Sequence, residues 1–278
     1  KHKLEKKNHY VYLLSIAQLE SGDNIEVINV PWIKNSWLHR LVFDFFCAPK
    51  FVKKYQIDEI LSLQNIHIPN TKVHQSVYVH NALPFSEHKF SFAENHFLWI
   101  YQNLIGKKIK QSIRCADKII VQTEWMKRAI EKDIPNRNGN IEVEFPVIEG
   151  FVENSYVPGE ICVFFYPANS AEFKNHKIIL EAAEHLKQQG VSQYQCVFTL
   201  QGGETETIKK VYEEGIKNEL PFQWVGQLSK DEMAVWYAKS VLLFPSYIET
   251  VGLPIYEAAY IGAPLLLAKC EYTADVIS

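Results

Sequence analysis

The chain has 278 residues, 47% of them hydrophobic and 22% charged, and its formal net charge is −3. This length and composition suit two globular domains of ordinary size, and the small negative charge excludes a protein that binds nucleic acid through bulk positive charge. Five scattered cysteines without CxxC spacing argue against a disulfide framework or a zinc site, and they favour a reducing, cytoplasmic setting.

The first half of the chain alternates short β-rich runs with helical patterns. Apolar runs beside turn residues predict strands, and apolar residues three or four apart predict helices. We expect strands at residues 10–16, 25–30, 57–63, 74–80, 117–122 and 141–147, and helices at residues 37–55, 92–112 and 124–132. Thr123 is expected to cap the last of these helices. No apolar run reaches the roughly 18 residues that a membrane-spanning helix needs.

The helix predicted at residues 37–55 carries an apolar stripe with basic residues around it. The stripe consists of Leu38, Leu41, Val42, Phe45 and Phe46. In most soluble proteins such a stripe faces the core. A stripe with a basic border can also lie on a bilayer surface, and the border here is made of Arg40, Lys50, Lys53 and Lys54. Both interpretations stay open at this point.

The second half of the chain has a regular alternation of strand and helix. Residues 149–160 contain glycines, a proline and an asparagine in an irregular stretch, which predicts a linker between two domains. After it, strands are expected at residues 161–166, 194–200, 222–225, 241–244 and 264–268, with helices between them that include residues 177–189 and 254–261. Ser229 and Glu232 have the spacing of a capping box. This order predicts a parallel, doubly wound α/β sheet.

The stretch at residues 241–267 has the features of a binding site. A strand ends at Pro245, a polar loop follows, and Pro254 suits the first turn of a helix. A helix that starts beside the carboxyl end of a parallel strand offers free N–H groups to an anion. Glu249 and Glu257 flank this point, and ionised carboxylates accept hydrogen bonds from sugar hydroxyls. Alternatively, Glu249 is a solvated loop residue and Glu257 only complements the helix dipole.

The pattern P-S-x-x-E-x-x-G-L-P-x-x-E-A-x-x-x-G-x-P, from Pro245 to Pro264, resembles the donor-site signature of glycosyltransferase family 4. This resemblance implies a retaining enzyme with the GT-B fold, in which two Rossmann-like doubly wound α/β domains face each other across a cleft. Residues 1–150 would form the acceptor-side domain without its first strand and loop. Residues 151–278 would form the nucleotide-sugar-binding domain without its C-terminal end, so the chain is expected to be trimmed at both ends.

The resemblance also implies roles for single residues. Glu249, Lys174 and His80 would be catalytic, with Lys174 on the diphosphate and His80 near the donor sugar at the end of its strand. Family members often have an Arg five residues before this Lys, and Asn169 occupies that position here. The donor would be bound by Glu257 at its ribose, by the amides of Thr250, Val251, Gly252 and Leu253 at its phosphates, and by Asn169, Gly202, Gly203, Val225 and Gly226.

The function implied is transfer of a sugar from a nucleoside-diphosphate-sugar to a saccharide or lipid-linked acceptor, in surface polysaccharide or glycolipid assembly. No metal or cofactor is expected, because the helix start and Lys174 would neutralise the leaving diphosphate. We expect a cytoplasmic protein with peripheral contact at the inner face of the membrane and no nucleic-acid partner. A non-catalytic GT-B subunit that stabilises a partner enzyme is the alternative. A dinucleotide-binding oxidoreductase is disfavoured, because no GxGxxG follows a predicted strand.

Overall fold

The computed structural model describes residues 7–16, 19–135, 139–148 and 155–277. These residues divide into two compact units. The first draws on Lys1–Val79, Lys108–Ile120 and Arg137–Asn140, and the second on His80–Lys107, Val121–Asn136 and Ile141–Ser278. The boundary predicted between residues 150 and 151 lies outside the described residues, so that division into domains stays a prediction.

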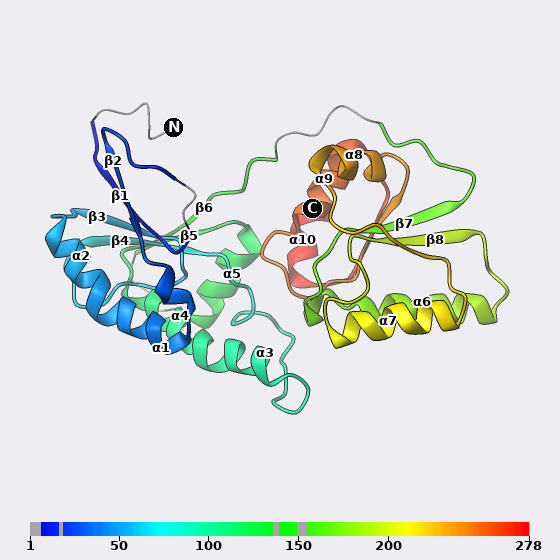
Figure 1. Ribbon diagram of the computed structural model, residues 1–278, viewed down its shortest axis with the longest axis horizontal. Helices are drawn as coiled ribbons and strands as arrows, with labels where there is room; N and C mark the ends of the chain where they lie inside the picture. The colour runs from blue at the N-terminus through cyan, green and yellow to red at the C-terminus, as the bar shows by residue number, and fades with distance from the viewer. Residues whose placement is uncertain (1–6, 17–18, 136–138, 149–154, 278) are drawn as a thin grey trace. The chain divides into compact units, whose positions relative to one another are not determined.

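The first half of the chain contains two small sheets (Figure 1). In one sheet, β1 (Tyr10–Leu14) pairs in parallel with β2 (Ile25–Asn29). The other has the order β3-β4-β5-β6, from β3 (Glu59–Ser62), β4 (His74–Val79), β5 (Lys118–Val121) and β6 (Asn140–Val143). Val77, Val79 and Ile119 are fully buried on these strands. The predicted strands are therefore confirmed, most of them shorter by one to three residues at their ends.

The helix predicted at residues 37–55 is interrupted by a π-helical turn. After a short 3-10 helix, η2 (Pro31–Lys34), the chain forms α1 (Trp37–Val42), the π-helical turn η3 (Phe43–Cys47) and α2 (Ala48–Lys54). Phe43 within this wider turn and Ala48 just after it are buried. Of the two interpretations of the apolar stripe, the one that faces it to the core does not hold for most of it, because four of its residues are exposed: Leu38, Val42, Phe45 and Phe46.

A second helical segment contains another π-helical turn. It runs through α3 (His96–Ile100), η4 (Tyr101–Ile105) and α4 (Gly106–Cys115), so the helix predicted at residues 92–112 begins and ends a few residues later. The helix predicted after Thr123 is α5 (Glu124–Asp133). Thr123 precedes it, but its side chain makes no capping hydrogen bond. The Thr123 hydroxyl donates to the carbonyl of Thr250 at 2.9 Å, which corrects the predicted cap.

The second half of the chain forms a five-stranded sheet in the order β11-β10-β7-β8-β9 (Figure 1). Each pair of neighbouring strands in this sheet is parallel. The strands are β7 (Cys162–Tyr166), β8 (Tyr194–Phe198), β9 (Phe222–Trp224), β10 (Val241–Phe244) and β11 (Leu265–Leu267). This order is that of a doubly wound sheet, which confirms the predicted fold class.

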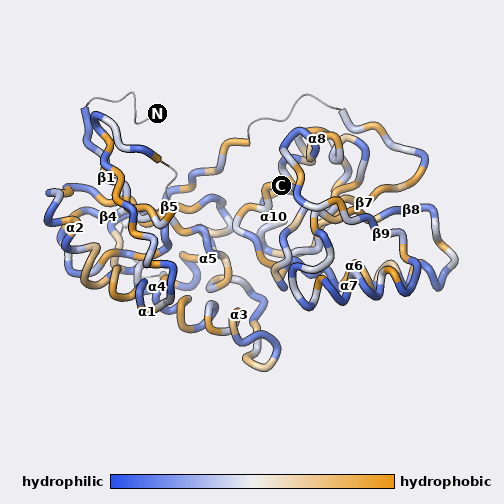
Figure 2. Tube along the Cα trace, in the orientation of Figure 1, coloured by the Kyte–Doolittle hydropathy of each residue, from blue (hydrophilic) through white to orange (hydrophobic). Residues whose placement is uncertain are grey.

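Helices cover both faces of this sheet. Figure 1 shows α6 (His176–Gln188) and α7 (Glu206–Lys217) on one side, with α8 (Lys230–Tyr237) and α9 (Leu253–Ile261) on the other. Hydrophobic and hydrophilic residues alternate along α6 and α7, as expected for helices with one buried face (Figure 2). The capping box of Ser229 and Glu232 is confirmed at the start of α8. The helix α10 (Glu271–Ile277) was not predicted. Among the described residues, no helix has both the length and the apolar character needed to cross a bilayer.

Candidate functional site

The candidate site lies where the strand order of the five-stranded sheet changes direction. The strands β7 and β10 are neighbours in the sheet, yet α6 follows β7 on one face and α9 follows β10 on the other. The loops after two such strands diverge and leave a crevice at their carboxyl ends, where doubly wound sheets bind ligands. Lys174 follows β7 at the end of a short 3-10 helix, η5 (Glu172–Lys174), and Glu249 follows β10.

Lys174 and Glu249 form an ion pair that joins these two loops. The distance from Lys174 Nζ to Glu249 Oε1 is 2.5 Å, and their side chains are 12% and 13% exposed. Further contacts join the two loops, because the amide of Tyr247 donates to the carbonyl of Phe173 at 3.0 Å. The Tyr166 hydroxyl donates to the Lys174 carbonyl at 2.5 Å. The structure therefore brings together two of the three residues predicted to be catalytic.

Buried rings surround the ion pair. Burial raises the pKa of Tyr166, and the negative charge of Glu249 raises it further. Burial lowers the pKa of His176 to about 4, and the positive charge of Lys174 acts in the same direction. His176 is therefore neutral at physiological pH, and its Nε2 is buried with no hydrogen-bond partner among the described residues. Its ring lies 4.9 Å from the ring of Tyr166, which indicates a packing role at the start of α6.

The start of α9 offers backbone N–H groups beside Glu249. Gly252 precedes the helix in the left-handed region, with φ of 71°, which favours glycine. A Cβ there would lie 3.1 Å from Ile255 Cδ1. Within the part of the chain that the structure describes, no group accepts a hydrogen bond from the amides of residues 250–253. The Thr250 carbonyl accepts hydrogen bonds from Thr123 and from the indole of Trp125, which fixes the loop.

Glu257 lies one helical turn beyond the start of α9 and is half-buried. Its Oε2 accepts a hydrogen bond of 2.8 Å from the hydroxyl of Tyr237, the last residue of α8. Burial raises the pKa of Glu257, whereas this hydrogen bond and the charge of Lys230 lower it. No sequence pattern singles out Tyr237, because a tyrosine in a helical pattern is typical of a core.

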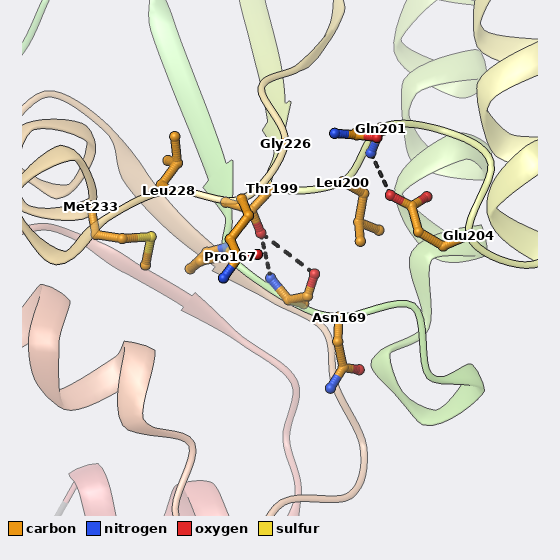
Figure 3. A pocket seen from close by; sticks show the side chains of 11 residues that line it. Pro167, Asn169, Thr199, Leu200, Gln201, Glu204, Gly226, Leu228 and Met233 are labelled. Atoms are coloured by element: carbon orange, nitrogen blue, oxygen red, sulfur yellow. Dashed lines mark hydrogen bonds between the residues drawn. The ribbon is translucent and has the colours of Figure 1, made fainter. Parts of the chain in front are cut away.

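A pocket of about 510 Å³ opens at the carboxyl ends of β7, β8 and β9 (Figure 3). Two predicted donor-binding residues, Asn169 and Gly226, line it together. Thr199 supports the wall, because its hydroxyl accepts a hydrogen bond of 3.2 Å from the amide of Ala168. The remaining lining residues include Leu228 and Met233, which give the pocket an apolar side. A pocket with apolar walls and amide side chains suits a flat heterocycle.

The two glycines predicted to approach a ligand, Gly202 and Gly203, already donate hydrogen bonds from their amides to a carboxylate. Glu204 accepts hydrogen bonds from the amides of Gln201, Gly202 and Gly203, at 2.5, 3.1 and 3.1 Å. These bonds lower the pKa of Glu204. The amides of Val225 and Gly226 are also engaged, since they donate to the carbonyls of Phe198 and Leu200 at the ends of the sheet.

The histidines before α3 lie in different surroundings. His80, the third residue predicted to be catalytic, follows β4 and is exposed, although nearby protein still desolvates its ring and lowers its pKa. Its catalytic role stays a prediction. His88 lies against the loop after β10 instead, with its ring 4.3 Å from that of Tyr247. Its Nε2 is buried and has no hydrogen-bond partner in the part of the chain that the structure describes. The sequence held no periodic signal that could place His88 there.

No group of three or more His, Cys, Asp or Glu side chains that could hold a metal ion occurs among the described residues. Their cysteines are not joined by disulfides.

Comparison with known proteins supports the fold class and the family resemblance that the signature suggests. Residues 153–278 match the family model of Glycosyl transferases group 1. WaaG, a glycosyltransferase involved in lipopolysaccharide biosynthesis, has a similar structure at 13% identity and a TM-score of 0.65, covering 98% of this chain and 76% of WaaG. For Anabaena HepE in complex with UDP-glucose, the identity is 14%, the TM-score 0.60, and the coverage 97% of this chain and 83% of HepE.

A third similar structure is the pneumococcal O-GlcNAc transferase GtfA in complex with UDP and GlcNAc. It is 16% identical with a TM-score of 0.54, and the match covers 80% of this chain. The chain spans only 44% of the length of GtfA. Comparison with curated protein sequences gives no significant match. These structures identify the fold as GT-B, and the match to the Glycosyl transferases group 1 family model lies within that fold at residues 153–278.

Proposed function

We propose that this protein is a retaining glycosyltransferase that transfers a sugar from a nucleoside-diphosphate-sugar to a saccharide or lipid-linked acceptor. The observation that carries the proposal is the ion pair of Lys174 and Glu249 beside the open amides at the start of α9. A diphosphate needs a cation and N–H donors, and sugar hydroxyls need a carboxylate. These groups meet at the switch point of a sheet, inside the segment that matches the family model.

Each group has a place in the proposed reaction. When the bond between the anomeric carbon and the diphosphate oxygen breaks, negative charge develops on the leaving diphosphate. Lys174 and the amides of residues 250–253 stabilise that charge, because they are already oriented before the reaction. Glu249 accepts hydrogen bonds from the hydroxyls of the donor sugar. Donor binding therefore replaces part of the Lys174–Glu249 contact with contacts to the diphosphate and the sugar.

The nucleoside end of the donor is assigned to Glu257 and to the pocket of Figure 3. Glu257 accepts hydrogen bonds from the ribose hydroxyls, and the base enters the pocket lined by Asn169 and Gly226. HepE was solved with UDP-glucose and GtfA with UDP and GlcNAc, which makes UDP the first nucleotide to test.

The proposal also covers where in the cell the protein acts and in which pathway its acceptor is used. We infer a cytoplasmic protein that acts in surface polysaccharide or glycolipid assembly, with peripheral contact at the inner face of the membrane. The exposed face of α1 and η3, made of Leu38, Val42, Phe45 and Phe46, supports the contact with a membrane.

The test is a screen of the full chain against a panel of nucleotide-sugars, with release of nucleoside diphosphate as the readout. Hydrolysis or transfer from one donor is expected. Glu257→Gln should weaken binding of the free nucleoside diphosphate about tenfold or more, because a ribose hydroxyl loses a charged acceptor. Glu249→Gln should leave that affinity nearly unchanged and lower kcat. Glu181→Gln, at an exposed position on α6, is the matched control.

One observation favours a second candidate, a non-catalytic GT-B subunit that stabilises a partner enzyme. Asn169 stands where family members often carry an Arg for the diphosphate, and it lines the pocket as a neutral side chain. A subunit of this kind would release no nucleoside diphosphate from any donor. Saturable nucleotide binding that disappears in Glu257→Ala, together with turnover of one donor, would decide against it.

A further inference from the structure

We propose that Tyr237 is a positioning residue of the donor site, which holds the Glu257 carboxylate in the orientation that accepts hydrogen bonds from a ribose. This inference rests on the proposed function, because it concerns the residue assigned there to the ribose. Tyr237 does not touch the donor in this arrangement, and it acts through Glu257.

The position of Tyr237 leaves its side chain little freedom. It is the last residue of α8, and it is fully buried. Its ring packs edge-on against the ring of Phe165 on β7, with the centroids 5.5 Å apart. A buried phenol needs a hydrogen-bond partner, because an unsatisfied hydroxyl is strongly unfavourable in a protein interior. The Tyr237 hydroxyl meets this need by donating to Glu257 Oε2 at 2.8 Å.

This hydrogen bond fixes one end of the carboxylate and leaves the other available. An ionised carboxylate has two oxygens and about four acceptor sites. Tyr237 occupies one of these sites on Oε2. Among the described residues, the Glu257 side chain makes no second hydrogen bond. Oε1 is therefore the oxygen that can receive ribose hydroxyls, in an orientation that the buried ring of Tyr237 determines.

The same contact favours the charged form of Glu257. Burial raises the pKa of Glu257, and the hydrogen bond from Tyr237 and the positive charge of Lys230 lower it. Both of these residues belong to α8. The two strands packed against α9, β10 and β11, consist of the apolar sequences VLLF and LLL, so they bring no titratable side chain to it. Tyr237 and Lys230 are thus the groups that oppose the effect of burial on the pKa of this carboxylate and favour its charged form.

The experiment measures binding of UDP and GDP to the full chain by calorimetry between pH 5 and pH 8. The wild type is compared with Tyr237→Phe and with Tyr194→Phe, which removes another buried phenol hydrogen bond, to the Ala183 carbonyl at 3.3 Å. Tyr237→Phe is expected to bind about tenfold more weakly at neutral pH. Its affinity should also begin to fall at a higher pH than that of the wild type, because Glu257 becomes protonated more easily. Tyr194→Phe should match the wild type.

A double-mutant cycle separates positioning from general loss of stability. In a Glu257→Gln background, Tyr237→Phe should cause little further loss of affinity, since the group that it positions is already changed. Thermal unfolding of each variant shows whether the chain is folded. If the wild type binds neither nucleotide, the proposed function fails and this inference fails with it. If the wild type binds and a folded Tyr237→Phe binds equally with the same pH profile, this inference alone is overturned.

Discussion

Lys174 Nζ lies 2.5 Å from Glu249 Oε1, so the cation assigned to the diphosphate is paired with the carboxylate assigned to the sugar. The two side chains come from loops about 75 residues apart in the sequence, and each is nearly buried. A buried ion pair contributes little net stability, because desolvation offsets much of the attraction. Under the proposed function, the pair consists of two binding groups that neutralise each other until the donor arrives.

The first prediction concerns Lys174. Lys174→Met should lower kcat/KM for the nucleotide-sugar about 100- to 1,000-fold, because a preorganised positive charge at the leaving diphosphate is lost. Steady-state kinetics with the donor found in the screen provides the measurement. Lys177→Met, at an exposed position on the first turn of α6, is the matched control and should retain activity. Equal activity of the two variants would show that Lys174 does not stabilise the leaving diphosphate.

The second prediction follows from the buried, neutral His176. Its pKa is about 4 in the folded protein against an ordinary value of 6.5. Between these values the unfolded chain binds a proton that the folded chain does not, so folding is stabilised above pH 6.5 and loses that stabilisation as the pH falls towards 4. The loss amounts to about 3 kcal/mol at most. Urea unfolding measures the free energy of unfolding at pH 7 and at pH 5. From pH 7 to pH 5 this free energy should decrease less for His176→Phe than for the wild type.

A control for this measurement lies on the same helix. His185 is exposed near the end of α6. In His185→Phe, the free energy of unfolding should decrease from pH 7 to pH 5 as much as it does in the wild type. If the free energy of unfolding falls as much from pH 7 to pH 5 in His176→Phe as in the wild type, groups other than His176 cause the loss of stability in acid.

The third prediction uses two adjacent glycines with different surroundings. A Cβ on Gly202 would lie 2.3 Å from Tyr212 Cδ2, and the residue has φ of 96°. A Cβ on Gly203 would meet no atom within 4 Å. Gly202→Ala should therefore lower the free energy of unfolding by about 2 to 4 kcal/mol, the sum of backbone strain and a clash. Gly203→Ala should change it by less than about 1 kcal/mol. Equal changes in the free energy of unfolding for the two variants, measured by urea unfolding, would contradict the conformation described for this loop.

Much of the second half of the chain could be predicted, because its signals are local. The capping box of Ser229 and Glu232 depends on residues three positions apart, and Gly262 ends α9 in the left-handed conformation that a glycine after a helix indicates. The alternation of apolar strands and amphipathic helices was sufficient to predict a doubly wound sheet, and the donor-site signature placed Glu249 and Glu257 beside one helix start.

The features that could not be predicted depend on contacts between distant segments. Tyr237 meets Glu257 across two packed helices, and nothing in its own helix distinguishes it from a core tyrosine. The carboxylate of Glu204 turns back onto the glycine amides of its own loop, where the sequence suggested an open approach for a ligand. The π-helical turn η3 has no simple sequence pattern, and the sequence alone could not decide whether the apolar stripe around it is buried or exposed.

The last prediction concerns this exposed face of α1 and η3. Leu38 and Phe46 are 67% and 65% exposed, and the exposed Lys50 and Lys53 follow on α2. If the face rests on a membrane, the full chain should bind vesicles that contain anionic phosphatidylglycerol, and high salt should weaken the binding. Phe46→Ser should weaken it about tenfold or more, since a phenylalanine side chain no longer enters the lipid. Ile216→Ser, at a residue that is 62% exposed on α7, is the control and should bind like the wild type. Vesicle flotation measures the fraction of each of the three proteins that binds the vesicles. If this fraction is the same for Phe46→Ser and the wild type, the exposed face of α1 and η3 does not contact the membrane.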